Sequence, residues 1–293
     1  MPFTTLLNAE TLEHHLADPT FVIVDCRFML DDEDWGGRAY LEARVPGAVF
    51  ADINRDLSGP KTGTNGRHPL PDPSVLAATL GRLGIDRSMQ VVAYDQGGAM
   101  YASRLWWLLR WMGHEAVAVL NGGFAHWQAQ HLPVESGAPP VRPARVFAGV
   151  PRASMIVDVN QAARITHDPR WRLLDARAPE RYRGEIEPID RVPGHIPSAR
   201  NRPFQSNLDE RGLFLPHEQL RDQLQQVITG VEPDHVVCYC GSGVTACQDL
   251  LALEHAGLSG AKLYPGSWSE WSSDPGRPVE CGSERADLAA GPS

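Results

Sequence analysis

The sequence of 293 residues has few lysines, few cysteines and no long apolar run. Only Lys61 and Lys262 are lysines and the formal charge is −9, so no broad positive field favours a nucleic-acid partner. No stretch approaches the roughly 18 to 20 apolar residues of a membrane span, and the N-terminus lacks the basic and apolar regions of a secretory signal. We therefore expect a cytoplasmic protein that binds neither nucleic acid nor membrane.

The scarce cysteines are also unevenly spaced: they are Cys26, Cys238, Cys240, Cys247 and Cys281. A disulfide scaffold in a chain of this length would need more of them, so we expect reduced thiols. The spacing of Cys238 and Cys240 does not match the paired C-x2-C ligands of a zinc site. The sequence also has no dinucleotide-binding G-x-G-x-x-G motif in a strand–helix unit and no P-loop, so we expect no metal and no cofactor.

What the chain does contain is an internal repeat. The strand-like run VVAYDQGG at 91–98 corresponds to VVCYCGSG at 236–243, which lies 145 positions later. A helical run follows each of them, SRLWWLLRWMGH in the first half and CQDLLALEHAGL in the second. Short apolar strands that alternate with helices predict an α/β fold in which each half forms a parallel sheet with crossover helices.

The repeat extends upstream and indicates two domains. VIVDCR at 22–27 corresponds to RLLDAR at 172–177, and between the halves Pro139, Pro140 and Pro143 prevent a continuous helix or central strand. With 42% apolar and 22% charged residues, the chain can form two cores of ordinary size. The expected parts are an N-terminal domain at 1–137, a linker at 138–152, a C-terminal domain at 153–285 and a tail at 286–293.

One cysteine stands where a strand is expected to meet a helix. Cys240 begins the loop CGSGVTA, and in the first half the corresponding residue is Asp95. A glycine-containing loop that leads from a strand into a helix directs its amide N–H groups inward, and these groups and the helix dipole favour a thiolate. Such a thiolate is a nucleophile. The alternative interpretation is a buried cysteine at a strand end beside a tight turn, but Asp95 indicates that the fold does not require sulfur there.

The residues around this loop carry a resemblance to a known family. The segments LLDARAPERYRG, VPGHIP, CYCGSGVTAC and LYPGSWSEW resemble those of tandem-domain rhodanese-type sulfurtransferases, and CGSGVT is similar to the 3-mercaptopyruvate branch. The resemblance implies two tandem rhodanese-like domains, each a parallel sheet flanked by helices, of which the N-terminal copy is inactive. It also implies that Cys240 attacks the sulfur of 3-mercaptopyruvate, becomes a persulfide and passes the sulfur to an acceptor.

The resemblance further implies roles for the other loop residues. The loop amides, those of Gly241, Gly243 and Val244, would hold the charge of the persulfide, and the hydroxyls of Ser242 and Thr245 would supply or relay a proton. The thiosulfate branch of the family has a basic loop of the C-R-K-G-V-T type, because cations stabilise the leaving sulfite. Gly241 and Ser242 are neutral, which favours a thiol donor. The alternative is a thiosulfate:cyanide sulfurtransferase in which arginines outside the loop replace those cations, with Arg181, Arg183 and Arg191 as candidates.

Substrate-binding residues follow from the same comparison. Arg181 matches the carboxylate-binding arginine of the family. The family's second arginine would fall at position 190, which is Asp190 in this chain, and Arg191 lies one position later. His68 is the candidate that polarises Ser242, although the family's acidic partner for this histidine is replaced here by Asn54. Two further residues, Arg177 and His195, are interpreted as structural.

Other classes of function are tested against the same loop. A phosphatase of this fold needs an arginine six places after the cysteine, and Ala246 stands there. A non-catalytic binding or redox module remains an alternative, in which Cys240 pairs with Cys247 or Cys238 on oxidation. The expected partners are a small sulfur donor and an acceptor, which is cyanide, a small thiol or a protein thiol such as thioredoxin. The chain is expected to be a monomer.

Overall fold

The computed structural model describes residues 1–283, which form two compact units. The expected tail at 286–293 lies outside the described residues. The first unit comprises Met1–Gly59, Leu70–Arg152 and Leu208–Phe214, and the second comprises Pro60–Pro69, Ala153–Asn207 and the chain from Leu215 onward. Each unit thus includes a short segment from the other half of the sequence. Among the helices of the described residues, none is long and apolar enough to cross a membrane.

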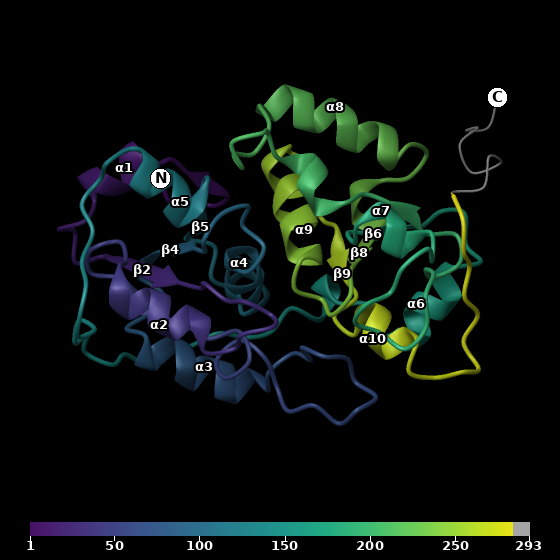
Figure 1. Ribbon diagram of the computed structural model, residues 1–293, viewed down its shortest axis with the longest axis horizontal. Helices are drawn as coiled ribbons and strands as arrows, with labels where there is room; N and C mark the ends of the chain where they lie inside the picture. Colours follow the sequence, from purple (N-terminus) through teal and green to yellow (C-terminus); the bar gives the residue numbers. More distant parts are fainter. Residues whose placement is uncertain (284–293) are drawn as a thin grey trace. The chain divides into compact units, whose positions relative to one another are not determined.

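The first unit is built around a five-stranded parallel sheet with the order β1-β5-β4-β2-β3. Figure 1 shows α1 and α5 on one side of this sheet and α2 and α3 on the other. The central strands are buried along their whole length, which suits the continuous apolar runs of a parallel sheet. Its elements are β1 (Leu6–Leu7), α1 (Ala9–His14), β2 (Phe21–Asp25), α2 (Trp35–Glu42), β3 (Val49–Phe50), α3 (Pro73–Arg82), β4 (Gln90–Tyr94), α4 (Ala102–Trp111), β5 (Val117–Leu120) and α5 (Gly123–Ala129).

The second unit repeats this arrangement with a four-stranded parallel sheet of order β7-β6-β8-β9. Where the first unit has β1 beside β5, the second has a single parallel bridge from Ile156 to Leu263 of β9. Its elements are η1 (Ala153–Met155), α6 (Val159–Ile165), β6 (Arg172–Asp175), α7 (Pro179–Tyr182), β7 (Arg200–Asn201), η2 (Phe204–Asn207), α8 (His217–Val227), η3 (Pro233–His235), β8 (Val236–Tyr239), α9 (Ala246–His255), β9 (Lys262–Leu263) and α10 (Ser267–Trp271).

The two sheets share their register, which confirms the repeat that the sequence predicted. Asp25 pairs with Tyr94 across β2 and β4, and Asp175 pairs with Tyr239 across β6 and β8. Each unit is therefore an α/β domain of the same topology. The strand before Asp95, β4, and the strand before Cys240, β8, are both interior strands of their sheets. The cysteine that follows β8 thus lies at the carboxyl end of a central strand, where ligands of open α/β sheets bind.

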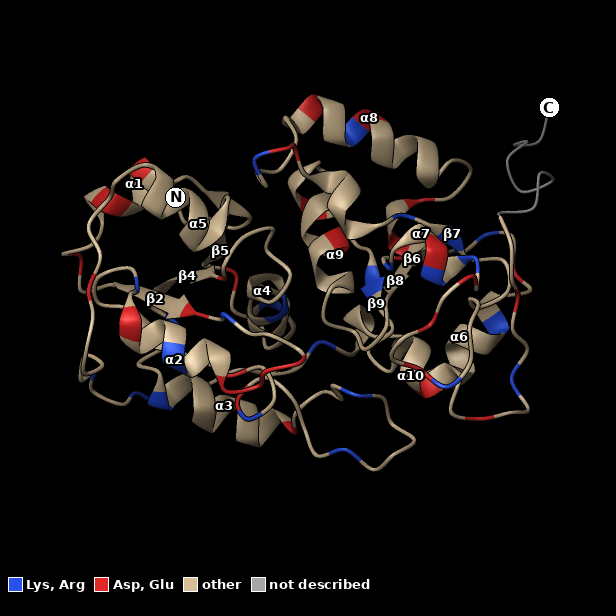
Figure 2. Ribbon diagram, in the orientation of Figure 1, with Lys and Arg blue, Asp and Glu red and all other residues tan. Residues whose placement is uncertain are grey.

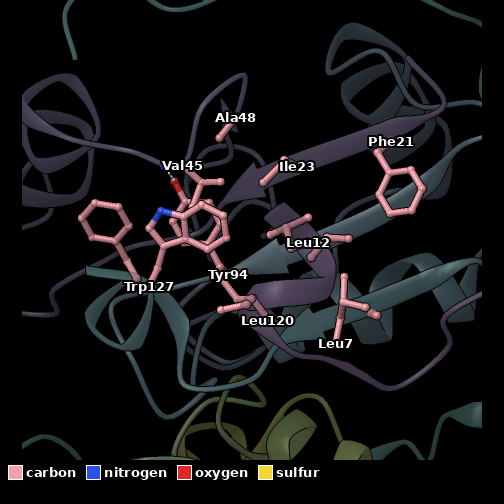
Figure 3. Close-up of a cluster of buried hydrophobic side chains, with 13 residues drawn as sticks. Leu7, Leu12, Phe21, Ile23, Val45, Ala48, Tyr94, Leu120 and Trp127 are labelled. Carbon is pink, nitrogen blue, oxygen red and sulfur yellow. Dashed lines mark hydrogen bonds between the residues drawn. The ribbon is translucent and has the colours of Figure 1, made fainter. Parts of the chain in front are cut away.

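Each core contains a cluster of buried aliphatic and aromatic side chains. Figure 3 shows this cluster in the first unit, where Val45, Tyr94 and Trp127 lie together and the amide of Val45 donates to the Tyr94 hydroxyl at 3.3 Å. In the second unit the amide of Ile196 donates to the hydroxyl of Tyr239 at 3.2 Å. The repeated contacts show that both halves fold by the same packing.

Residues 138–152, which the sequence predicts as a linker, lie along the first unit. The amide of Arg145 donates to the carbonyl of Gly81 at 2.8 Å, and that of Val150 donates to the carbonyl of Met112 at 3.1 Å. The first of these contacts leaves no room for a side chain at position 81, because a Cβ built on Gly81 would lie 2.3 Å from the carbonyl oxygen of Arg145. The segment is therefore ordered by backbone contacts that its proline-rich sequence does not indicate.

Candidate active site

Cys240 follows directly after β8, and its loop leads into α9. The thiol is buried, with 2% of the residue exposed, and the amide of Gly243 donates a hydrogen bond to its Sγ at 3.2 Å. The backbone is held from the other side, because the amide of Cys240 donates to Ser267 Oγ at 3.1 Å. The sulfur thus faces an inward-pointing amide of its own loop, as the sequence predicted for a strand-to-helix turn.

The loop requires glycine at position 243. Gly243 has a φ of +76°, and a Cβ there would lie 2.3 Å from the carbonyl oxygen of Pro265. Both the left-handed conformation and the close backbone approach exclude a side chain. After this turn, Val244 is buried and Thr245 is the last residue before α9. One short segment thereby brings together all the loop residues that the sequence singled out.

His68 reaches this loop because residues 60–69 fold as part of the second unit. Its Nδ1 and the hydroxyl oxygen of Ser242 are 2.8 Å apart, and both residues are buried. A hydroxyl can donate or accept, so the pair can pass a proton in either direction. The structure therefore joins the two residues that the sequence placed in a relay, although they are separated by 174 positions.

Arg181 extends from α7 toward the same loop. Its Nη2 donates to Glu187 Oε1 at 2.6 Å and to Asp190 Oδ2 at 3.3 Å. Burial opposes the ionisation of Glu187, but the hydrogen bonds from Arg181 and from nearby amides outweigh it and hold its pKa below the ordinary value. Figure 2 shows acidic and basic residues next to each other on α7. The predicted carboxylate-binding arginine is thus already paired with two carboxylates of its own chain.

A second arginine, Arg67, was not singled out from the sequence. Its guanidinium pairs with Asp190 Oδ1, and a Cβ built on Gly241 would lie 2.7 Å from its Nη2 and 3.7 Å from Nη1 of Arg181. Both guanidiniums therefore lie over the residue that follows Cys240. By contrast, Arg191 is exposed, and it is Asp190 that contacts the two arginines. The only signal for Arg67 in the sequence is its position next to His68.

These contacts give the loop a charged environment. Its own side chains are neutral at Gly241 and Ser242, but Arg67 and Arg181 bring two cations to Gly241. Glu187 and Asp190 balance them. Burial raises the pKa of Asp190 above its ordinary value, in spite of the opposing effect of Arg67. The site is therefore a compensated ionic network rather than a region without charge.

The corresponding place in the first unit holds a carboxylate. Asp95 is buried and accepts hydrogen bonds from the amides of Gly97, Tyr101 and Ala102 at 3.0, 2.8 and 3.1 Å. Burial raises its pKa to about 6, although these amides favour the ionised form. The turn thus surrounds a carboxylate with inward-pointing amides, just as the second unit directs an amide at a thiol.

The residues interpreted as structural have structural contacts. Arg177 donates to Asp175 Oδ2 at 2.6 Å and to the carbonyl of Gly194 at 2.7 Å, and both charged residues are buried. His195 is buried, with its Nδ1 at 2.7 Å from the carbonyl oxygen of Tyr182 and its ring stacked on the Tyr182 ring. Burial lowers the pKa of His195, so the neutral ring is favoured.

None of the five cysteines forms a disulfide within residues 1–283. Cys26, Cys238 and Cys247 are buried, and burial raises the pKa of Cys26 and Cys238 well above the ordinary value. Cys247 lies on the first turn of α9 with its Sγ 3.4 Å from the carbonyl oxygen of Gly243. Only Cys281 is exposed. Within residues 1–283, no group of three or more histidine, cysteine or acidic side chains is placed to hold a metal ion.

A family model and several known proteins are similar to this chain over most of its length. A family model described as "Rhodanese-like domain" matches residues 8–130 and 158–274. The chain is 47% identical to the "Probable 3-mercaptopyruvate sulfurtransferase" of Pseudomonas aeruginosa, over 96% of this chain and 100% of that protein. It is 41% identical to the "Putative thiosulfate sulfurtransferase SseB" of Mycobacterium tuberculosis, over 88% and 89% of the two chains.

A solved structure shows the same fold. The crystal structure of SseA from Escherichia coli, one of the 3-mercaptopyruvate sulfotransferases with the "Rhodanese" fold, superposes with a TM-score of 0.79 at 33% identity. The match covers 91% of this chain and 99% of that one. Both repeats of the present chain therefore have counterparts in a protein of known structure.

Proposed function

Since the chain belongs to the rhodanese-like family and is a sulfurtransferase, we propose that it moves sulfane sulfur from 3-mercaptopyruvate to a thiol or cyanide through a persulfide on Cys240. The observation that carries this proposal is the geometry at the end of β8. There the Cys240 thiol faces the amide of Gly243, and the buried Ser242–His68 hydrogen bond lies two residues further along the loop. A nucleophile and a proton carrier are thus adjacent.

In the first half-reaction, the Cys240 thiolate attacks the sulfur of the donor. A bond forms between the two sulfurs, the carbon–sulfur bond of 3-mercaptopyruvate breaks, and its electron pair leaves with the enolate of pyruvate. Ser242, hydrogen-bonded to His68, supplies or relays the proton that converts this enolate to pyruvate. The loop amides of Gly241, Gly243 and Val244 stabilise the persulfide anion, and the Thr245 hydroxyl is a further candidate for proton transfer.

In the second half-reaction, an acceptor attacks the outer sulfur of the persulfide. The sulfur–sulfur bond breaks, Cys240 leaves as a thiolate, and the sulfur departs as an acceptor persulfide or as thiocyanate. The acceptor is a protein thiol such as thioredoxin, a small thiol, or cyanide. Because the donor product leaves before the acceptor reacts, the reaction follows ping-pong kinetics.

The donor carboxylate binds to Arg181 in this proposal. The planar guanidinium can hold a carboxylate through two parallel hydrogen bonds. Arg191 is the weaker candidate, because it is exposed and Asp190 stands beside the guanidiniums instead. The N-terminal unit takes no part in transfer, because Asp95 occupies the place of the nucleophile. Since no disulfide joins the cysteines of residues 1–283, we propose a reducing compartment such as the cytoplasm.

A second candidate function is sulfur transfer from thiosulfate. Two guanidiniums lie over Gly241, close to the place where the thiosulfate branch of the family has loop cations. They would stabilise the dianionic donor and the sulfite that leaves. The relative named as a thiosulfate sulfurtransferase is consistent with this candidate.

The experiment that tests the proposal measures sulfur transfer to cyanide from each donor by the wild type, by Cys240→Ser and by Cys281→Ser. We expect kcat/KM to favour 3-mercaptopyruvate by at least about tenfold, or about 1.4 kcal/mol in the transition state. Cys240→Ser should abolish transfer, whereas Cys281→Ser, which removes the exposed thiol, should leave it unchanged. A preference for thiosulfate would establish the second candidate. Retained transfer by Cys240→Ser would refute both candidates, because both require the Cys240 persulfide. No transfer from either donor by the wild type would leave the non-catalytic binding module.

A further inference from the structure

Two hydrogen bonds hold Arg67 and its neighbour His68 to other segments of the second unit. The Arg67 amide donates to Ser269 Oγ at 3.1 Å, and the next residue, His68, is hydrogen-bonded to Ser242. Ser269 in turn is tied to the cysteine loop, because its amide donates to the carbonyl of Gly241 at 3.0 Å. The position of Arg67 over Gly241 is therefore fixed by the same contacts that fix the cysteine loop.

The two guanidiniums over Gly241 share one carboxylate. Asp190 Oδ1 accepts from Arg67, and Oδ2 accepts from Arg181 at 3.3 Å. Glu187 already occupies another edge of Arg181, with Nε to Oε2 at 3.2 Å. A group that replaced the Asp190 carboxylate would thus meet one donor from each guanidinium, as an anionic substrate requires.

Burial disfavours the ionised form of the Asp190 carboxylate in this site. Its side chain is only 6% exposed, and burial raises its pKa even though two arginines lie beside it. The arginines themselves are more open, with 25% of the Arg67 and 16% of the Arg181 side chain exposed. The Nε atom of Arg67 is buried and has no hydrogen-bond partner within the described part of the chain. The guanidinium pair therefore retains hydrogen-bonding capacity that Asp190 does not use.

We propose that Arg67 and Arg181 together form the clamp that binds the anionic group of the donor, and that Asp190 is a resident counter-anion which the donor displaces from it. The proposal rests on the proposed function, since it concerns the donor of the sulfur transfer. Arg67 would then have the role of the family's second carboxylate-binding arginine, whose position in the sequence is occupied here by Asp190. This arrangement also makes Asp190 a specificity-determining residue, because a fixed negative charge beside the clamp disfavours a dianion more than a monoanion.

The kinetic test uses charge-neutral variants of each partner. Arg67→Gln should lower kcat/KM for 3-mercaptopyruvate about 10- to 100-fold, mainly through KM, because a charged hydrogen bond to the donor is lost. Arg67→Lys should recover part of this loss, since it keeps the charge without the planar fork. The matched control is Arg170→Gln, because Arg170 belongs to the same unit, is exposed and pairs only with the nearby Asp168 within the described residues. This control should stay within about twofold of the wild type.

The second pair of variants tests the role of Asp190. Asp190→Asn should raise kcat/KM for thiosulfate about 3- to 10-fold and should raise it less for 3-mercaptopyruvate, because the dianion is repelled twice as strongly by the removed charge. Glu185→Gln is its control, since it removes an exposed negative charge of the same segment. A decrease for both donors would overturn the proposal, because Asp190 would then only hold the arginines in position.

An alkylation measurement separates failure of the clamp from failure of the sulfur transfer. The rates at which iodoacetate, an anion, and neutral iodoacetamide modify Cys240 are compared by mass spectrometry of the peptide that contains it. Arg67→Gln should lower the ratio of the two rates about 5- to 10-fold, and Asp190→Asn should raise it. A change in this ratio without any sulfur transfer would support the clamp and refute the proposed function. An unchanged ratio in both variants would overturn the clamp, whatever the enzyme transfers.

Discussion

The carboxyl group of Asp249 offers a quantitative test of the folded second unit. Asp249 lies on α9, the helix that follows the cysteine loop, and is fully buried. Its Oδ1 accepts from Asn207 Nδ2 at 2.6 Å, but its Oδ2 has no hydrogen-bond partner within residues 1–283. Burial raises its pKa from 3.8 to about 7, and the opposing effects of Arg202 and Asn207 are smaller.

This raised pKa makes the second unit less stable at high pH. Between about pH 4 and pH 7 the folded unit keeps a proton on Asp249 that the unfolded chain releases, so the free energy of unfolding falls as the pH rises. Above the folded pKa both states are ionised and the loss is complete. With a pKa of 3.8 unfolded and about 7 folded, the loss between pH 5 and pH 8.5 is about 2 to 3 kcal/mol.

The perturbation is Asp249→Asn, which keeps the shape of the side chain and cannot ionise. We expect the difference between its free energy of unfolding and that of the wild type to be about 2 to 3 kcal/mol larger, in favour of the variant, at pH 8.5 than at pH 5. The assay is urea unfolding followed by tryptophan fluorescence and fitted with one transition for each unit. Asp222→Asn on α8 is the control, because Asp222 is exposed. If the difference between Asp249→Asn and the wild type were the same at both pH values, the raised pKa would be refuted.

Three further predictions follow from the contacts of the second unit. Gly243→Ala should lower the free energy of unfolding by about 2 kcal/mol or more, because it combines a positive φ with a backbone clash. Gly98→Ala, its counterpart with the same φ of +76° but only a leucine methyl nearby, should cost less in the same urea assay. Arg177→Gln should cost about 3 to 5 kcal/mol by leaving Asp175 buried without its partner, and the added change Asp175→Asn should recover part of this loss. Gly241→Ala should leave the urea midpoint near that of the wild type and raise KM for 3-mercaptopyruvate about tenfold, because its Cβ displaces the flexible end of Arg67. An unchanged KM would show that Arg67 does not contribute to donor binding.

Much of the fold was predictable because it depends on local patterns that occur twice. The runs VIVD and VVCY are continuous apolar strands, and helices of amphipathic or apolar character follow each core strand. Duplication then supplied a comparison within one sequence, which identified Cys240 as the residue that differs in chemistry from Asp95. The loop from Cys240 to Thr245 was predicted for the same reason, because a strand, a glycine turn and a helix place its residues together without any distant contact.

The ionic network was not predictable in the same way. Arg67 lies in a segment without periodicity, and only the folding of residues 60–69 with the second unit brings its guanidinium to Gly241. Asp190 occupies a position where the family resemblance suggested an arginine, and its pairing with Arg67 spans 123 positions of the sequence. Contacts between loops this far apart leave no spacing that a single sequence can reveal.

The sequence by itself determined the two α/β repeats, the place of Cys240 at the end of a central strand and the turn that directs an amide at its thiol. Each of these follows from residues that are neighbours along the chain, where backbone geometry leaves few alternatives. Only the tertiary structure decided which charges surround that thiol. A loop whose own side chains are neutral lies beneath two guanidiniums and beside two carboxylates. The fold brings these charges to the loop from two separate segments, one with Arg67 and one with Arg181, Glu187 and Asp190.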